Sequence, residues 1–146
     1  MIEVGRLHGT DRARWTELWR AYLSFYEADL SEAVFDETWA RIQHDTALHA
    51  LAARADGAIV GITHFLFHNS AWTTTPVCYL QDLFVDPAIR GQGVGRTLIE
   101  AVAERARAQA STRMYWLTQD HNATARSLYD RIARHSGFIR YEYPLG

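Results

Sequence analysis

The chain has 146 residues, 48% of them hydrophobic and 22% charged, a composition typical of a single globular domain over residues 1–146. Its formal net charge is only −2 and it has no basic run, so we expect no nucleic-acid partner. No apolar stretch approaches the ~20 residues of a membrane span, and the N-terminus does not resemble a secretion signal. We therefore expect a cytoplasmic protein without a membrane partner.

Two features of composition exclude whole classes of chemistry. All 15 residues counted as Lys or Arg are arginine, so no mechanism that needs a lysine amine is available. The one cysteine, Cys78, excludes an intrachain disulfide and a thiolate metal cluster. His64 and His68 are four positions apart on a predicted strand without a third ligand nearby, so we expect no metal site.

The first part of the chain predicts a strand, two helices and a hairpin. Residues 2–7 alternate as in a strand, and Thr10 or Asp11 is expected to cap the first helix. Apolar side chains then recur at helical spacing: Trp15, Leu18, Trp19, Tyr22 and Tyr26. Ser31 is expected to cap a second helix, and Asp56-Gly57 to join strands at 48–54 and 58–67.

The second part predicts strands and helices in alternation. CYLQDLFV, residues 78–85, is typical of a buried strand, and a helix is expected to end near Ala110. A strand at 113–119 precedes a helix capped by Asn122, with Gly137 just past its end and a last strand at 138–143. The order β-α-α-β-β-β-α-β-α-β predicts an α/β domain with a mixed sheet.

Three alternating glycines, Gly91, Gly93 and Gly95, lie between Arg90 and Arg96 in the stretch DPAIRGQGVGR. This stretch leads into a predicted helix, whose first turn has unpaired N–H donors and a partial positive charge. Glycines let a phosphate approach such donors closely, so we predict an anion site rather than an ordinary turn. The spacing matches neither the dinucleotide pattern G-x-G-x-x-G nor the nucleoside-triphosphate pattern, which needs a lysine.

The motif R-x-x-G-x-G at Arg90, Gly93 and Gly95 resembles the coenzyme A signature of the GNAT superfamily of N-acetyltransferases. YLQDLFVDP resembles the fourth strand of that family, and NATARSLYDR followed by HSGF resembles the segment after its fifth strand. Within the superfamily, the similarity is to the branch that acts on polyamines and histone-type amines. It implies a GNAT-like fold, in which helices flank a mixed, mostly antiparallel central sheet.

The resemblance also implies a function, which is direct transfer of the acetyl group of acetyl-CoA to a primary amine in a ternary complex. The pantetheine arm of the cofactor would pair with the backbone of Leu83, Phe84 and Val85. Its pyrophosphate would lie on the backbone N–H groups of one continuous stretch, namely Arg90, Gly91, Gln92, Gly93, Val94, Gly95 and Arg96.

Two further residues are assigned to the cofactor and to catalysis by the same resemblance. Asn122 would hydrogen-bond acetyl-CoA, and Tyr129 would be the general acid for the departing thiolate. From helical spacing alone, Tyr129 could equally be a core residue that packs with Leu128 and Ile132.

The general base must be argued separately, because an alkyl amine with a pKa near 10.4 has to lose a proton before it attacks. In polyamine-acetylating members the position of Gln81 is commonly a glutamate base, and glutamine cannot accept the proton. Asp82 is the nearest carboxylate and our candidate, but strand alternation turns it to the opposite face unless a bulge re-aims it. Glu27 or an ordered water is the alternative base, and Asp82 could instead be a buried carboxylate held by backbone donors.

An acidic stretch with interleaved aromatic residues favours a small cationic, polyamine-like amine as acceptor. No arginine occurs from residue 21 to residue 40, and the carboxylates gathered there are Glu27, Asp29, Glu32, Asp36 and Glu37. In the family the first two helices commonly line the acceptor site. The residues predicted to bind the substrate are therefore Tyr22, Tyr26 and Glu27, together with Gln81. A solvated helix face is the alternative interpretation of the same stretch.

Two other functions remain open from the sequence. The missing glutamate at Gln81 favours a non-catalytic acyl-CoA sensor or scaffold. The acidic stretch also fits a protein acetyltransferase that acts on lysine side chains or an N-terminus. The sequence leaves open whether the chain is a monomer or a homodimer, which its many aromatic residues would favour.

Overall fold

The computed structural model describes residues 1–146 as two units, residues 1–116 and residues 117–146. The second unit contains one helix, α4 (Ala123–Ile132). The first unit contains the remaining elements, which are β1 (Ile2–Gly5), α1 (Arg12–Phe25), α2 (Glu32–His44), β2 (His49–Ala55), β3 (Ala58–His68), β4 (Val77–Val85), α3 (Val94–Ala108) and β5 (Met114–Tyr115). Short 3₁₀ turns at Gly9–Asp11 and Pro87–Ile89 precede α1 and α3.

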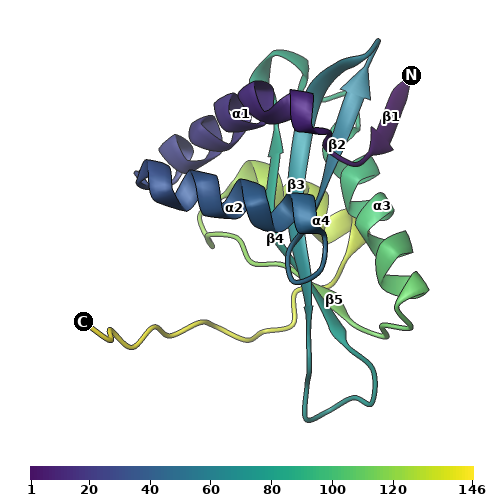
Figure 1. Ribbon diagram of the computed structural model, residues 1–146. Coiled ribbons are helices and arrows are strands. Elements are labelled where there is room, and N and C mark those ends of the chain that lie inside the picture. Colours follow the sequence, from purple (N-terminus) through teal and green to yellow (C-terminus); the bar gives the residue numbers. More distant parts are fainter. The chain divides into compact units, whose positions relative to one another are not determined.

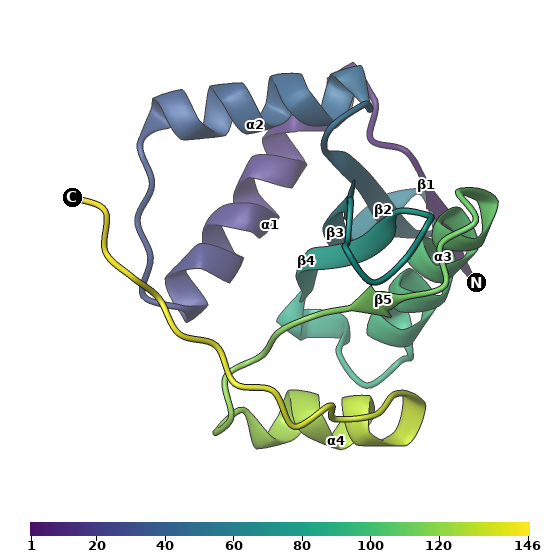
Figure 2. The same ribbon diagram turned by 90° about the horizontal axis from the view of Figure 1, so that it is seen from below.

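The five strands form one sheet in the order β1-β2-β3-β4-β5. The first four strands pair antiparallel, and β5 pairs parallel with β4, so the predicted mixed, mostly antiparallel sheet is confirmed. Helices α1 and α2 cover one face of this sheet and α3 covers the other (Figures 1 and 2). None of the four helices combines the length and the apolar character that crossing a bilayer requires.

Each helix of the first unit buries an apolar stripe, although Tyr22 and Tyr26 of the stripe predicted for α1 are only partly buried. In α1, Trp15, Leu18 and Trp19 are buried, and they pack in one cluster with Phe35 of α2 and Phe84 of β4. On the opposite face of the sheet, α3 buries the apolar side chains of Val94, Leu98, Ile99, Val102 and Ala106. Removal of this apolar surface from water is what holds the helices on the sheet.

Local signals set several element boundaries. The Ser31 hydroxyl accepts from the N–H of Val34 at the start of α2, and Asp56 and Gly57 both have positive φ, +51° and +84°, as a two-residue hairpin requires. The expectation that Asp11 caps α1 with its side chain is wrong. Its carboxylate accepts instead from the His8 N–H at 2.7 Å and from Arg54 at 2.6 Å, because β2 brings that guanidinium beside it.

The C-terminal part differs from the expectation. β5 spans only two residues rather than 113–119, and residues 133–146 contain no helix or strand, so the strand expected at 138–143 is not formed. Because α4 ends at Ile132 with Ala133 as its C-cap, Gly137 is not the residue that ends it. Alternating apolar residues favour a strand, but a strand also needs a neighbouring backbone to pair with, and the sequence pattern does not report this.

Candidate active site

The turn between β4 and α3 presents a row of backbone N–H groups without partners. No hydrogen bond within the protein uses the N–H groups of residues 91–96. Gly91 (φ +87°) and Gly93 (φ +77°) adopt the left-handed conformation, and a Cβ atom on either would meet nothing within 4 Å. Gly95 lies inside α3 and has no positive φ. Open space above free N–H donors at a helix start fits a phosphate group.

Two arginines border this loop. The Nε of Arg90 donates to the Val85 carbonyl at 3.1 Å, and its guanidinium lies 5.4 Å from the centre of the Phe84 ring. The Nε of Arg96, in the first turn of α3, lies 2.9 Å from a carboxylate oxygen of Glu100. The charge of Arg90 is therefore held at the end of β4 and that of Arg96 at the start of α3.

Asp86 anchors the entry to the loop. Its N–H donates to the Val60 carbonyl at 2.8 Å, one carboxylate oxygen accepts from the Ala88 N–H, and the other accepts from Arg14 at 2.7 Å. The Ala88 N–H, and after it the Arg14 guanidinium, hold the pKa of Asp86 below its usual value. Arg14 also donates to the Ile59 carbonyl, so the loop entry is tied to both α1 and β3.

A β-bulge at Gln81 decides where Asp82 points. Leu80 is opposite Phe65 in the β3–β4 register and Asp82 is opposite His64, so Gln81 is the extra residue. His64 and Phe65 are neighbours on β3, so their side chains face opposite sides of the sheet. Their partners Asp82 and Leu80 therefore also face opposite sides, although they are two positions apart on β4. The bulge turns Asp82 to the face covered by α1 and leaves Gln81 exposed.

On that face Asp82 belongs to a hydrogen-bonded chain of three side chains. One carboxylate oxygen lies 2.9 Å from Nδ1 of His64, and the other ring nitrogen of His64 lies 2.9 Å from Nε1 of Trp15. His64 and Trp15 are almost inaccessible to solvent, whereas the Asp82 side chain is 21% exposed.

Both ring nitrogens of His68 are also engaged, one by the Asn69 carbonyl and the other by the Tyr115 hydroxyl.

The edge of β4 that follows Tyr79 is unpaired on one side. β5 pairs only with Cys78 and Tyr79, whereas β4 continues to Val85 along β3. Since the N–H of Asp86 points to β3, alternation along the strand points the N–H groups of Leu83 and Val85 to the unpaired edge. Such an edge can receive an extended ligand in the manner of an added strand.

Aromatic side chains gather at the C-terminal end of α1. The Tyr22 ring lies 5.1 Å from that of Tyr26 and 6.2 Å from that of Phe84, so the predicted substrate residues Tyr22 and Tyr26 lie together. Phe84 is two positions after Asp82 on the same face of β4. Glu27, the residue after Tyr26, is exposed and has a positive φ of +56°.

The acidic stretch is less acidic than the sequence suggests. Glu32 pairs with Arg20 at 3.0 Å, Glu37 pairs with Arg41 at 3.3 Å, and Asp36 pairs with Arg12. These arginines lie outside the arginine-free stretch, and helix packing and helical spacing bring them to it. Only Glu27 and Asp29 keep a carboxylate without an ion-pair partner.

Asn122 and Tyr129 belong to the second unit and are described within it. Asn122 caps α4, where its side-chain oxygen accepts from the Ala125 N–H at 3.4 Å, as the sequence predicts. Its amide nitrogen lies 3.5 Å from the Thr118 hydroxyl. Tyr129 lies two turns into the same helix.

Cys78 is excluded as a covalent carrier of the acetyl group. It is fully buried, and burial raises the pKa of its thiol to about 11. The nucleophilic thiolate is therefore scarce at neutral pH.

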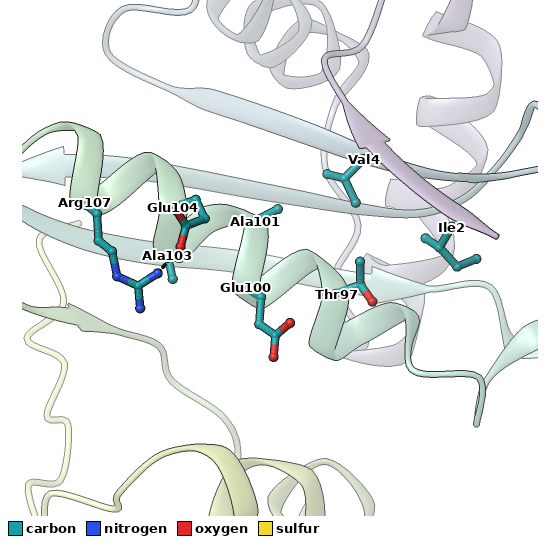
Figure 3. Close-up of a pocket in the computed structure, with 8 residues that line it drawn as sticks. All are labelled: Ile2, Val4, Thr97, Glu100, Ala101, Ala103, Glu104 and Arg107. Carbon is teal, nitrogen blue, oxygen red and sulfur yellow. Dashed lines mark hydrogen bonds and ion pairs between the residues drawn. The ribbon is translucent and has the colours of Figure 1, made fainter.

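A hollow on the surface lies between β1 and α3 (Figure 3). Its lining includes Ile2 and Val4 on one side and Thr97, Glu100 and Arg107 on the other. None of the residues predicted to bind the cofactor or the substrate contributes to it, so this hollow is separate from the candidate site.

Sequence reasoning missed the supporting residues of the site. Arg14 lies 72 positions from Asp86, to which it donates. His64 lies 18 positions from Asp82 and contacts it directly, and Trp15, 67 positions from Asp82, is connected to it through His64. No local pattern reveals such pairs. Asp86 carried a usable signal, because an aspartate before proline favours a turn in which its side chain accepts a nearby N–H.

Comparison with known proteins identifies the family. The model of the acetyltransferase (GNAT) family matches residues 14–133. A D-amino-acid N-acetyltransferase of Saccharomyces cerevisiae is 33% identical over 97% of this chain and 89% of its own length. A thialysine N-epsilon-acetyltransferase of Caenorhabditis elegans is 31% identical over 59% of this chain and 53% of its own.

Solved structures share the fold at low identity. A ribosomal-protein-alanine N-acetyltransferase from Brucella melitensis matches with a TM-score of 0.83 at 22% identity, over 99% of each chain. An aminoglycoside N-acetyltransferase in complex with CoA matches with a TM-score of 0.86 at 17% identity, over 100% of this chain and 96% of its own. The chain therefore belongs to the acetyltransferase (GNAT) family and is an acetyl-CoA-dependent N-acetyltransferase.

Proposed function

We propose that this enzyme acetylates the primary amine of a small cationic molecule and that Asp82 is the base that deprotonates it. The observation that carries the proposal is the bulge at Gln81. It turns the Asp82 carboxylate to the face on which Tyr22 and Phe84 lie, where an amine held at the end of α1 would meet it. The carboxylate that polyamine-acetylating members commonly have at the position of Gln81 would thereby be replaced by the next residue of the strand.

The loop residues fit the cofactor. Acetyl-CoA supplies the acetyl group as a thioester when it is bound. The free N–H groups of residues 91–96 would hold its pyrophosphate between Arg90 and Arg96. The unpaired edge, to which the N–H groups of Leu83 and Val85 on either side of Phe84 point, would hold its pantetheine arm. The Asn122 side chain would add a hydrogen bond.

Each chemical step is assigned to a residue of this chain. Asp82 would accept a proton from the substrate ammonium, which gives a free amine with a lone pair for attack. The N–C bond would form and the C–S bond would break, and the Tyr129 phenol would donate its proton to the leaving sulfur. The second proton, lost by the nitrogen as it becomes an amide, would restore the phenol through solvent. Because Cys78 is buried and its pKa is raised, we assign direct attack rather than an acyl-enzyme.

The test of the base compares two neighbouring variants. Asp82→Asn should lower kcat about 100-fold or more, because the amide cannot accept the proton, whereas Gln81→Ala, which removes a predicted substrate contact and no carboxylate, should act on KM for the amine rather than on kcat. Thiol release from acetyl-CoA is a suitable readout, since Cys78 is buried. Full turnover by Asp82→Asn would reject Asp82 as the base in favour of Glu27 or a water. Binding of acetyl-CoA without turnover on any amine would favour a sensor or scaffold.

A second candidate acceptor is the amine of an amino acid. Two observations favour it, namely the similarity to a D-amino-acid N-acetyltransferase and the neutralisation of Glu32, Asp36 and Glu37 by arginines. Spermidine, an aliphatic diamine, an aromatic amine, a lysine peptide and D- and L-amino acids should be compared side by side. We expect spermidine and the aliphatic diamine to give the highest kcat/KM.

Matched glutamate variants test the charge of the site. Glu27→Gln should raise KM for a diamine, because it removes an unpaired carboxylate beside Tyr26, whereas Glu37→Gln, on the outside of α2, should not. If an amino acid is the best acceptor and Glu27→Gln leaves KM for the diamine unchanged, an amino acid replaces the small cationic amine as the proposed acceptor. Preference for the lysine peptide would instead indicate a protein substrate.

A further inference from the structure

We propose that His64 is a positioning residue for the Asp82 carboxylate, and that Trp15 fixes the imidazole tautomer in which His64 acts. The inference rests on the proposed function, because it takes Asp82 as the base. The three side chains come from α1, β3 and β4, and they are joined by two contacts of 2.9 Å each.

The tautomer follows from the chemistry of the indole. The Nε1–H of Trp15 can only donate, so Nε2 of His64 must be the acceptor and carries no proton. The single ring proton is then on Nδ1, which faces Oδ2 of Asp82 and donates to it. A doubly protonated ring would oppose two N–H groups at 2.9 Å in a site that is 1% exposed, so the arrangement specifies a neutral imidazole.

This donor fixes which oxygen of Asp82 is free. The hydrogen bond from Nδ1 engages Oδ2 and leaves Oδ1 for the proton of the substrate. The Asp82 side chain is 21% exposed, whereas the His64 side chain that holds it is only 1% exposed. The carboxylate therefore lies at the boundary of the core. Holding a base in one orientation matters, because a displacement of ~1 Å at the reacting groups can cost about 100-fold in rate.

The bulge at Gln81 explains why Asp82 needs a positioning residue. Asp82 is the residue after an irregularity in β4, where strand pairing restrains the backbone less than in a regular ladder. The Thr63 hydroxyl, which donates to the Asp82 carbonyl at 2.8 Å, holds the main chain at the same point. His64 and Thr63 thus restrain the side chain and the backbone of one residue from adjacent positions on β3.

The chain provides a matched control for Trp15. Trp19 is also buried in α1 and its ring lies 5.5 Å from that of His64, close to the 6.0 Å of Trp15. The Nε1 of Trp19, however, has no hydrogen-bond partner. Trp15→Phe and Trp19→Phe therefore remove similar aromatic surface from one cluster, but only Trp15→Phe removes the donor that selects the tautomer.

The first test is spectroscopic and needs no substrate. In ¹⁵N-labelled protein at neutral pH, the ring of His64, assigned with His64→Asn, should show a protonated Nδ1 and an unprotonated Nε2. Trp19→Phe should keep this pattern, and Trp15→Phe should mix the two tautomers. A proton on Nε2 in the unsubstituted protein would overturn the proposal, whatever the substrate is.

The second test separates His64 from Asp82 in catalysis. His64→Leu should lower kcat about ten-fold with KM for acetyl-CoA unchanged, whereas His64→Asn, whose amide can replace the Nδ1 donor, should retain kcat within about three-fold. If Asp82→Asn is inactive while folded His64→Leu keeps full kcat, this inference fails and the proposed base stands. If Asp82→Asn keeps its turnover, the proposed base itself fails.

Discussion

Arg14 of α1 and Asp86 at the end of β4 form an ion pair across 72 positions of sequence, with Nη2 2.7 Å from Oδ2. The pair connects α1, which carries the predicted acceptor residue Tyr22, to the start of the glycine loop, which is predicted to bind the cofactor. The same carboxylate also accepts from the Ala88 N–H at 3.0 Å. Stability of this loop should therefore depend on the ionisation of Asp86.

The first prediction concerns pH. The Ala88 N–H and the Arg14 guanidinium lower the pKa of Asp86 below its usual 3.8, so its stabilisation is fully present above that value and is lost as the pH falls through the lowered pKa. Asp86→Asn should lower the free energy of unfolding by about 1 kcal/mol at pH 7, and the difference should shrink below pH 3.8. Urea unfolding from pH 7 to pH 3 measures it. Asp29→Asn, an exposed carboxylate without an ion-pair partner, is the control, and a constant difference for Asp86→Asn would contradict the prediction.

The second prediction concerns the glycine loop. Gly93→Ala places a methyl group in the space above the free N–H donors, so it should lower acetyl-CoA affinity at least ten-fold by calorimetry. Gly57→Ala is the matched control, because both glycines have positive φ and open surroundings. Both variants should lose about 1 kcal/mol of stability, and only Gly93→Ala should lose affinity. Equal affinity in the two folded variants would remove the loop from the cofactor site.

The third prediction concerns Gly61, which lets α3 approach β3 closely. A Cβ there would lie 3.1 Å from the side chains of Val94 and Leu98 and 3.2 Å from the Phe84 carbonyl oxygen. Gly61→Ala should cost about 1–3 kcal/mol in the free energy of unfolding, because the helix start has to move. Gly5→Ala on β1, where a Cβ would meet nothing within 4 Å, should cost far less in the same denaturation experiment. Similar values for the two variants would show that the close approach is unimportant.

The fourth prediction concerns the general acid. Tyr129→Phe should lower kcat about 10-fold to 100-fold with little change in the affinity for acetyl-CoA, since it removes a proton donor and not a binding group. Tyr141→Phe, a substitution in the same unit at an 86% exposed residue, should leave both unchanged. Steady-state kinetics and calorimetry report the two quantities separately. An unaffected kcat in Tyr129→Phe would return this tyrosine to a packing role.

The acidic stretch illustrates how a correct local observation can mislead. No arginine occurs between residues 21 and 40, and the carboxylates are where the sequence has them. Three of them are nevertheless paired. Packing of α1 beside α2 brings Arg12 and Arg20 to Asp36 and Glu32, and helical spacing within α2 brings Arg41 to Glu37. Charge on a surface depends on which helices are neighbours, and a sequence window reports only one helix at a time.

The sequence by itself determined the element order up to α4, the caps at Ser31 and Asn122, the Asp56-Gly57 hairpin and the glycine loop. These features depend on residues within a few positions of one another, so local pattern and turn chemistry suffice. Only the tertiary structure decided the bulge at Gln81 and the chain from Trp15 through His64 to Asp82. Strand register and contacts between distant side chains set these, and a shift of one residue in pairing turns a side chain to the other face of the sheet.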